Sequence, residues 1–225
     1  GVQHGVALYA YLADGSTRNL AIRNNYIHDF QKNAMAVNSG GSSVLTVQIV
    51  GNRIVGAGPT TVTAQNGIQV YRASGTLDGY IDSNYITGIA YDNTSASTKW
   101  AATSILNWLA DVDVSNNVVT GAHVGIYNID AQGAIANNRL DIVKVGVYAY
   151  GIIATDPPEA VPSPYEAPMA EAAAVAASED NMVGAASATE MPVNASGNVV
   201  TFSGPDNSST YGIEADAGYG ARSIR

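Results

Sequence analysis

The chain of 225 residues is long enough to form one domain with a substantial core, yet it is rich in small and polar residues and nearly lacks long apolar patterns of helical period. It contains no cysteine, which excludes disulfide bonds and thiolate metal sites. No segment is long and apolar enough to cross a bilayer, and no cleavable signal sequence precedes the first repeats. The sequence therefore predicts a soluble mature protein, or a fragment of a longer one.

The net charge of −9 is concentrated in one part of the chain. Residues 152–192 hold seven acidic side chains and no basic one, whereas residues 1–151 hold nine acidic and eight basic side chains. A nucleic-acid surface needs a basic stripe, and the nearly neutral first part has none. We therefore expect no nucleic-acid partner and no insertion into a membrane.

A short motif built around asparagine recurs along the whole chain. Apolar residues alternate with polar ones before each motif, and a branched aliphatic residue lies two positions after its second residue, Asn. Alternation on both sides of a fixed polar corner predicts two short strands, each with one buried face. The copies of the motif are NNYI at 24–27, GNRI at 51–54, SNYI at 83–86, NNVV at 116–119, NNRL at 137–140 and GNVV at 197–200.

A further strand is expected after each corner, and most of these strands begin with a small residue followed by an apolar one. The coil after Asn84 fits this pattern least well, and residues 103–106 fill the place there. The other starts are Ala34-Met35, Gly67-Ile68, Gly125-Ile126, Gly146-Val147 and Gly212-Ile213, with Gly5-Val6 ahead of them at the N-terminal edge.

The corner asparagine has a physical role in such a repeat. It tolerates a left-handed or bridge backbone, and its amide can bond its neighbours and the Asn of the next coil, about 4.8 Å away. With these corners and Gly-led strands, the chain resembles the right-handed parallel β-helix repeat proteins of the pectate-lyase-like superfamily. The resemblance implies an all-β fold, a right-handed parallel β-helix (solenoid) with Asn-ladder corners.

One insertion interrupts the repeats. We expect coils over residues 1–151, a Pro/Ala-rich acidic insertion over 152–192 and a further coil over 193–225 that continues in a longer chain. The first half of the insertion predicts an extended arm, and its second half predicts a short helix beginning near Pro168. A lid, a partner-docking arm and an acidic loop without a function are all consistent with its composition.

Outward positions on neighbouring corner strands bring carboxylates together in the predicted fold. Asp78, Tyr80 and Asp82 would lie beside Asp111 and Asp113 of the next coil. Pairs at these spacings match the carboxylate separations of glycoside hydrolases, so Asp82 and Asp113 are the candidate catalytic residues. Oxygen ligands also suit Ca²⁺, with Asp78, Asp82, Asp111 and Asp113 as ligands, although no cofactor is required. Equally, these carboxylates could simply be solvated charges on an open face.

A second outward column is expected on the Gly-led strands. Stacked exposed tyrosines with amides and carboxylates between them could form a platform for sugar rings. Tyrosine is also favoured in strands without any function, so the same side chains could simply cover the sheet. The predicted binding residues are Gln69, Tyr71, Tyr127, Tyr148, Tyr150 and Glu214.

The catalytic motifs of the superfamily are absent from the chain. Neither the polygalacturonase-like set (Asn-Thr-Asp, Asp-Asp, Gly-His-Gly, Arg-Ile-Lys) nor the Arg-x-Pro-x-x-Arg stretch of pectate lyases occurs. Two hypotheses follow from the resemblance. One is an extracellular or cell-surface module of bacterial or phage origin that binds or processes polysaccharide, as a lyase or glycoside hydrolase if it is an enzyme. The other is a non-catalytic structural or adhesion solenoid. Both allow oligomers.

Overall fold

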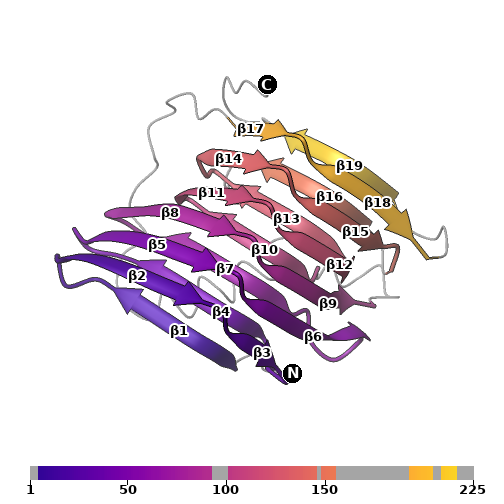
Figure 1. Ribbon diagram of the computed structural model, residues 1–225, viewed down its shortest axis with the longest axis horizontal. Helices are drawn as coiled ribbons and strands as arrows, with labels where there is room; N and C mark the ends of the chain where they lie inside the picture. Colours follow the sequence, from indigo (N-terminus) through magenta and orange to yellow (C-terminus); the bar gives the residue numbers. More distant parts are fainter. Residues whose placement is uncertain (1–4, 93–100, 146–147, 156–192, 205–208, 217–225) are drawn as a thin grey trace.

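The computed structural model describes residues 5–92, 101–145, 148–155, 193–204 and 209–216, and all regular structure in these residues is β-strand. The strands form three parallel sheets, and each strand pairs with the strand three places along the chain (Figure 1). The chain therefore winds as a parallel β-solenoid, as the Asn repeat predicted.

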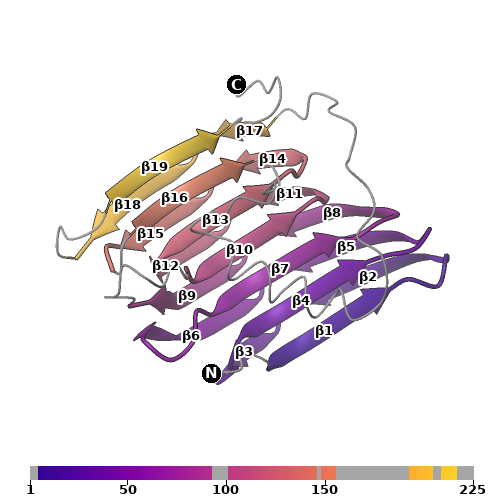
Figure 2. The ribbon, with the colours of Figure 1, turned by 180° about the vertical axis from the view of Figure 1, so that it is seen from behind.

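Each coil passes through the sheets in the order A, B, C. Sheet A contains β1 (Val6–Leu12), β4 (Asn33–Ser39), β7 (Asn66–Arg72), β10 (Thr103–Trp108), β13 (Val124–Ile129), β16 (Tyr148–Thr155) and β19 (Ser209–Asp216), and Figure 2 shows them in this order along the solenoid. Sheet B contains β2 (Thr17–Arg23), β5 (Val44–Val50), β8 (Thr76–Asp82), β11 (Asp111–Ser115), β14 (Gly133–Ala136) and β17 (Val193–Ser196). Sheet C contains β3 (Tyr26–His28), β6 (Arg53–Thr60), β9 (Tyr85–Tyr91), β12 (Val118–Ala122), β15 (Arg139–Val143) and β18 (Val199–Ser203).

The core is a column of stacked aliphatic side chains inside the solenoid. In the coil of β7–β9, Ile68 from sheet A, Ile81 from sheet B and Ile86 from sheet C are fully buried. The same positions in neighbouring coils are also aliphatic and belong to the same cluster. Alternation along sheet B directs one apolar residue in two into this core.

The corner asparagines form a continuous buried ladder between sheets B and C. The Oδ1 atom of Asn84 accepts hydrogen bonds from the backbone N–H and the Nδ2 of Asn52, both at 2.9 Å. The backbone N–H and the Nδ2 of Asn84 donate in turn to Oδ1 of Asn117, both at 3.0 Å. The same pattern runs from Asn25 at one end to Asn198 at the other, through Asn138. The ladder therefore has a direction, because each coil donates to the next one along the chain.

The sequence predicted that one asparagine at each corner would take the left-handed backbone and form the ladder bonds. In the structure these two roles belong to two consecutive residues. The first residue takes the left-handed backbone, with φ of 57° at Asn24, 64° at Gly51 and 56° at Ser83. The second residue is the ladder Asn. Gly and Asn tolerate positive φ more readily than other residues, which explains why five of the six corners have Gly or Asn at this position and only one has serine.

The strand starts of sheet A correct one predicted register. Ile126 pairs with Ile152, so the partner of Gly125 is Gly151 and the predicted start at Gly146-Val147 is wrong. A Cβ atom at Gly151 would lie 2.4 Å from the carbonyl oxygen of Gly212, so this position requires glycine. Both dipeptides fit the sequence pattern, and the close approach between coils decides between them. Residues 103–106 do occupy the place predicted for them, since Ile105 pairs with Ile68 and Ile126.

The chain leaves sheet A after Thr155 and re-enters sheet B at Val193. The predicted arm and helix of the insertion lie outside the described residues. From Val193 onward, the described residues add one strand to each sheet, as β17, β18 and β19.

Candidate functional site

The carboxylates predicted to gather on sheet B do lie on adjacent strands. Asp111 pairs with Asp78, Asp113 pairs with Tyr80, and Ser115 pairs with Asp82. The two candidate catalytic residues, Asp82 and Asp113, are therefore diagonal neighbours and do not face each other. The predicted alignment of β8 with β11 is confirmed by this register.

Asp82 is held by hydrogen bonds on both carboxylate oxygens. Its Oδ1 accepts from the Ser115 hydroxyl at 2.8 Å and from the Asn116 amide at 2.7 Å, and its Oδ2 accepts from the Ser83 hydroxyl at 2.7 Å. Partial burial acts to raise the pKa of Asp82, but these hydrogen bonds outweigh it and the net pKa is lowered. Asp82 is therefore ionised at neutral pH, which suits an acceptor and disfavours a general acid.

Asp113 is exposed and also serves the backbone. Its Oδ1 accepts a hydrogen bond of 2.7 Å from the N–H of Ala134 on the next coil. This contact ties β11 to β14 at a place where the strands carry few backbone pairs. The two carboxylates proposed for catalysis thus both have a structural role in joining corners and coils.

Asp78 and Asp111 form the other pair of the patch. Desolvation raises the pKa of Asp111, the nearby charge of Arg72 acts to lower it, and the charge of Asp78 raises it further. The Oδ1 atom of Asp78 is buried and has no hydrogen-bond partner. Arg72 donates from Nε to the carbonyl oxygen of Leu109, which places the guanidinium at the turn that leads into β11.

Within the part of the chain that the structure describes, no group of three or more His, Asp or Glu side chains comes together as possible metal ligands. Asp78 and Asp111 are neighbours, while Asp82 and Asp113 lie further along their strands and are turned to other partners. Ca²⁺ binding by these four residues stays a prediction.

Three of the predicted binding tyrosines on sheet A are buried, although the sequence predicted that they would be exposed. Tyr127 and Tyr150 are each 4% exposed, and Tyr71 is 5% exposed. They lie on the outer face with Leu106, Trp108 and Ile153, and together these side chains form a second apolar cluster, separate from the core. The outer face of sheet A in the middle coils is therefore packed like an interior.

The register explains part of this difference. Because Gly151 and not Gly146 begins the strand pattern, Ile153 lies beside Tyr127, and Tyr150 lies beside Val124 and Tyr211. The rings of Tyr150 and Tyr211 stack with centroids 5.0 Å apart. The predicted continuous column is thus broken, and its tyrosines belong to different columns.

Polar side chains on the same face are also buried. Gln69, predicted to bind substrate, accepts hydrogen bonds at its Oε1 from the amides of Asn33 and Asn66, at 3.4 and 3.3 Å. The Oδ1 atoms of Asn33 and Asn66 are themselves buried without a hydrogen-bond partner. Tyr148 and Glu214 lie on β16 and β19, but their side chains are outside the described part of the structure.

An exposed aromatic column that the sequence analysis missed lies on the outer face of sheet C. It begins with Tyr26, Arg53 and Tyr85, which are adjacent in register on β3, β6 and β9. Tyr26 is 58% and Tyr85 is 41% exposed. The guanidinium of Arg53 lies 5.1 Å from the centroid of the Tyr26 ring. We call these residues, together with Val118, Arg139 and Val199 that continue the column, the sheet C column.

A signal for the sheet C column was present in the repeat motif. Each of its members directly follows the ladder asparagine, as in NNYI and SNYI. Because the ladder Asn points inward, the next residue must point outward and the aliphatic residue after it must point back into the core. Aligning the motifs would therefore have found the column.

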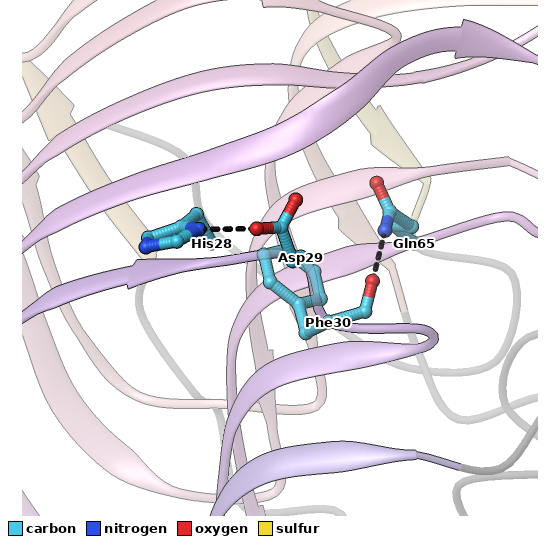
Figure 3. A network of polar contacts seen from close by, with 4 residues as sticks. All are labelled: His28, Asp29, Phe30 and Gln65. Atoms are coloured by element: carbon cyan, nitrogen blue, oxygen red, sulfur yellow. Dashed lines mark hydrogen bonds and ion pairs between the residues drawn. The ribbon is translucent and has the colours of Figure 1, made fainter.

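Hydrogen-bonding groups lie beside the sheet C column. The Thr120 hydroxyl donates to that of Thr87 at 3.0 Å and lies 3.5 Å from the Tyr85 hydroxyl. At the other end, the His28 ring lies 4.7 Å from the Tyr26 ring, and its Nδ1 lies 2.6 Å from Oδ2 of Asp29 (Figure 3). The face thus combines exposed rings with alcohol, imidazole and guanidinium groups.

The turn that follows His28 is held by hydrogen bonds from a buried side chain, Gln65. Asp29 has a left-handed backbone with φ of 56°. Gln65, which is buried, donates from Nε2 to the carbonyl oxygen of Phe30 at 2.7 Å (Figure 3). Its Oε1 accepts from the N–H of Ala57 at 2.8 Å. Through these two bonds Gln65 connects the turn after Asp29 to β6.

Comparison with known protein families, with curated proteins and with solved structures finds no match to this chain. Where the structure describes the chain, it has no helix long and apolar enough to span a membrane.

Proposed function

We propose that this solenoid binds polysaccharide along the outer face of sheet C. The observation that carries the proposal is the exposed pair Tyr26 and Tyr85 with Arg53 between them. Pairing across two rungs puts the tyrosines roughly 10 Å apart, so an extended chain lying along the solenoid would meet both rings. Exposed aromatic rings with adjacent polar groups suit sugar rings, which have apolar faces and hydroxyl edges.

Arg53 and the hydroxyl groups favour a hydroxyl-rich or acidic ligand over an apolar one. Arginine presents several donors in one plane, and it can bind a carboxylate with two of them while remaining stacked on an aromatic ring. The Thr87 and Thr120 hydroxyls offer both donors and acceptors beside Tyr85. An extracellular or cell-surface location fits such a ligand, and we propose it together with membership of the right-handed pectate-lyase-like β-helices.

Catalysis is a weaker part of the proposal than binding. The hydrogen bonds of Asp82 lower its pKa, so Asp82 lacks the raised pKa expected of a general acid. The carboxylate of Asp113 is already bonded to the N–H of Ala134 on the next coil. If the chain cleaves polysaccharide as a lyase or hydrolase, Asp113→Ala should abolish cleavage, whereas cleavage retained by Asp113→Ala would remove that residue from the mechanism.

A glycan array probed with the full chain tests the binding proposal. We expect retention of at least one class of extended glycan, and Tyr85→Ala should weaken binding roughly 5- to 10-fold, the equivalent of about 1 kcal/mol for one aromatic contact. Tyr9→Ala is the matched control, because Tyr9 is an exposed tyrosine on sheet A. It should leave the affinity unchanged.

Two results would contradict the proposal. One is the absence of any retained glycan with the folded wild-type chain. The other is equal loss of binding in Tyr85→Ala and Tyr9→Ala, which would show that the sheet C column has no special part in binding. Tyr71→Ala adds a further comparison, because a buried tyrosine should change stability before it changes affinity.

A structural or adhesion solenoid without catalysis is the second candidate function. The observation that favours it is the burial of the outer face of sheet A in the middle coils. There the sheet has the core on its inner face and the second apolar cluster on its outer face. Such packing stabilises a shaft, and it closes the described outer face of sheet A in the middle coils to a substrate. The same glycan array separates this function from the first.

A further inference from the structure

The outer face of sheet A is buried over five neighbouring strands, β4, β7, β10, β13 and β16, which lie side by side in Figure 2. Sheet C differs within the same coil. Tyr71 on β7 is 5% exposed, whereas Tyr85 on β9, which also points outward, is 41% exposed. All nineteen strands of the described chain belong to the three sheets around the core. The outer face of sheet A therefore has an occupant that is not one of these strands.

The middle of this face is apolar and aromatic. The rings of Tyr71 and Trp108 lie with their centroids 4.6 Å apart, and Tyr127 and Tyr150 belong to the same cluster. Its aliphatic members are Ala101, Leu106, Val124, Ile129 and Ile153. Burial of apolar surface favours packing of one segment on another, and Pro-rich segments in particular dock on aromatic surfaces. The occupant therefore presents apolar side chains to the sheet.

Buried polar atoms indicate that the occupant also has hydrogen-bonding groups. Asn38 and Asn66 are 1% and 0% exposed, and among the described residues neither Oδ1 atom has a hydrogen-bond partner. The same holds for Oδ1 of Asn33 and for Nε1 of Trp108, which are buried on the same face. Buried polar groups are rarely left without partners, because their desolvation is then uncompensated. A polypeptide segment, which carries donors and acceptors along its backbone, meets this requirement.

The Pro/Ala-rich insertion leaves the solenoid at the edge of this face. The connection from sheet A to sheet B takes only residues 109–110 after β10, but it takes residues 156–192 after β16. Thr155, the last residue of β16, pairs with Ile129 of the apolar cluster. Val193 then enters sheet B in register with β14. The extra length therefore begins and ends at one corner of the coil, beside the buried face.

Length distinguishes this insertion from residues 93–100, which precede β10 and also lie outside the described residues. From β4 to β16 the face measures roughly 19 Å, and five steps along a strand make it roughly 17 Å wide. One extended pass along the face takes about six residues, so passes packed roughly 5–10 Å apart need about 12–24 residues. Residues 156–192 are long enough to occupy the face, whereas residues 93–100 are enough for one pass.

Composition favours the same segment. Residues 156–192 are rich in alanine and proline and include Met169, Val175 and Met182, whereas residues 93–100 are mostly polar. We propose that the outer face of sheet A is the docking surface of residues 156–192 of the same chain. Their apolar side chains pack on the aromatic cluster, and their backbone groups pair with the buried amides. This inference does not depend on the proposed glycan binding.

Photo-cross-linking in the full chain identifies the occupant. Tyr71→p-benzoylphenylalanine keeps an aromatic ring on the face, and irradiation joins it to the segment that lies against it. Because residues 152–192 contain no lysine or arginine, the products are cut after glutamate, and not with trypsin, before mass spectrometry. We expect links within one chain to peptides from residues 156–192. Tyr85→p-benzoylphenylalanine is the matched control, because Tyr85 is an exposed tyrosine of the same coil, and it should give no such links.

Three outcomes would overturn the proposal. They are links from position 71 to residues 93–100 alone, links between two chains alone, and no links in a variant that circular dichroism shows to be folded. Should the Tyr71 variant not fold, Leu106→p-benzoylphenylalanine probes the same buried face with the same expected and contrary results.

A smaller substitution gives an independent measurement, because the chain has no natural cysteine. Ala36→Cys puts a thiol on the buried face, and Ala21→Cys puts one on the exposed face of sheet B. In the full chain the first thiol should react with a small thiol reagent at least about 100-fold more slowly than the second. Equal rates would mean that the outer face of sheet A is open, and the proposal would be wrong.

Discussion

Removing one asparagine from the middle of the ladder should cost far more stability than removing an exposed asparagine. Asn84 is 1% exposed, and besides the ladder bonds its Nδ2 donates to the carbonyl oxygens of Ile49 at 2.9 Å and Asp82 at 3.1 Å. In Asn84→Ala the buried N–H of Asn52 loses its acceptor, because that N–H bonds only to Oδ1 of Asn84 among the described contacts.

The expected loss can be estimated from these contacts. One buried donor left without a partner costs about 1–3 kcal/mol, and two lost hydrogen bonds of the amide add about 1 kcal/mol each. We therefore expect Asn84→Ala to lower the free energy of unfolding by about 3–5 kcal/mol. Asn84→Asp should lose at least as much at neutral pH, since it buries a charge against the carbonyl of Ile49 and Oδ1 of Asn117.

Urea unfolding followed by circular dichroism measures the effect, with Asn19→Ala as the exposed control. The control should change the free energy of unfolding by no more than about 0.5 kcal/mol. An Asn84→Ala midpoint equal to that of Asn19→Ala would refute the argument, because it would mean that water or a local rearrangement satisfies Asn52 as well as the ladder does.

Three further outcomes follow from the structure. The lowered pKa of Asp82 contributes stability that is present above its unfolded pKa of about 3.9 and is lost as the pH falls through its folded value. The urea midpoint of Asp82→Asn should therefore fall less than that of the wild type as the pH is lowered below about 4. The raised pKa of Asp111 has the opposite sign, so Asp111→Asn should raise the urea midpoint at pH 7 and give no gain at pH 3, where the wild-type carboxyl is already protonated. A thermal melt should show a much larger fall in melting temperature for Gly125→Ala than for Gly58→Ala. A Cβ at position 125 would lie 2.5 Å from the carbonyl oxygen of Gly151, whereas Gly58 has φ of +78° but open space around it, so Gly58→Ala should lower the free energy of unfolding by only about 1 kcal/mol. Equal falls would show that backbone strain, and not crowding between coils, governs these glycines.

The carboxylate patch and the tyrosines differ in how well the sequence predicted them. The patch depended only on the spacing of Asp78 and Asp82 from one corner and of Asp111 and Asp113 from the next, and the ladder fixes that spacing. The prediction for the tyrosines depended on where each strand of sheet A begins, and the distance from the asparagine corner to that start varies between coils. A shift from Gly146 to Gly151 therefore moved Tyr150 to a different column.

Exposure could not be predicted from alternation at all. A strand pattern states which side of the sheet a residue occupies, but it does not state what lies against the outer side. Tyr127 and Tyr85 both point outward, yet one is in a packed apolar cluster and the other faces solvent. Only the tertiary structure separates them, because burial depends on contacts between segments that are distant in sequence.

The sequence by itself determined the coil: a polar corner with one aliphatic residue on each side repeats often enough that stacking is the one arrangement that buries all of these residues. The tertiary structure decided which face is accessible. The direction of the ladder, in which each asparagine donates to the asparagine of the next coil, arises only when the coils are stacked, because a hydrogen bond between asparagines of different coils has no counterpart within a single repeat.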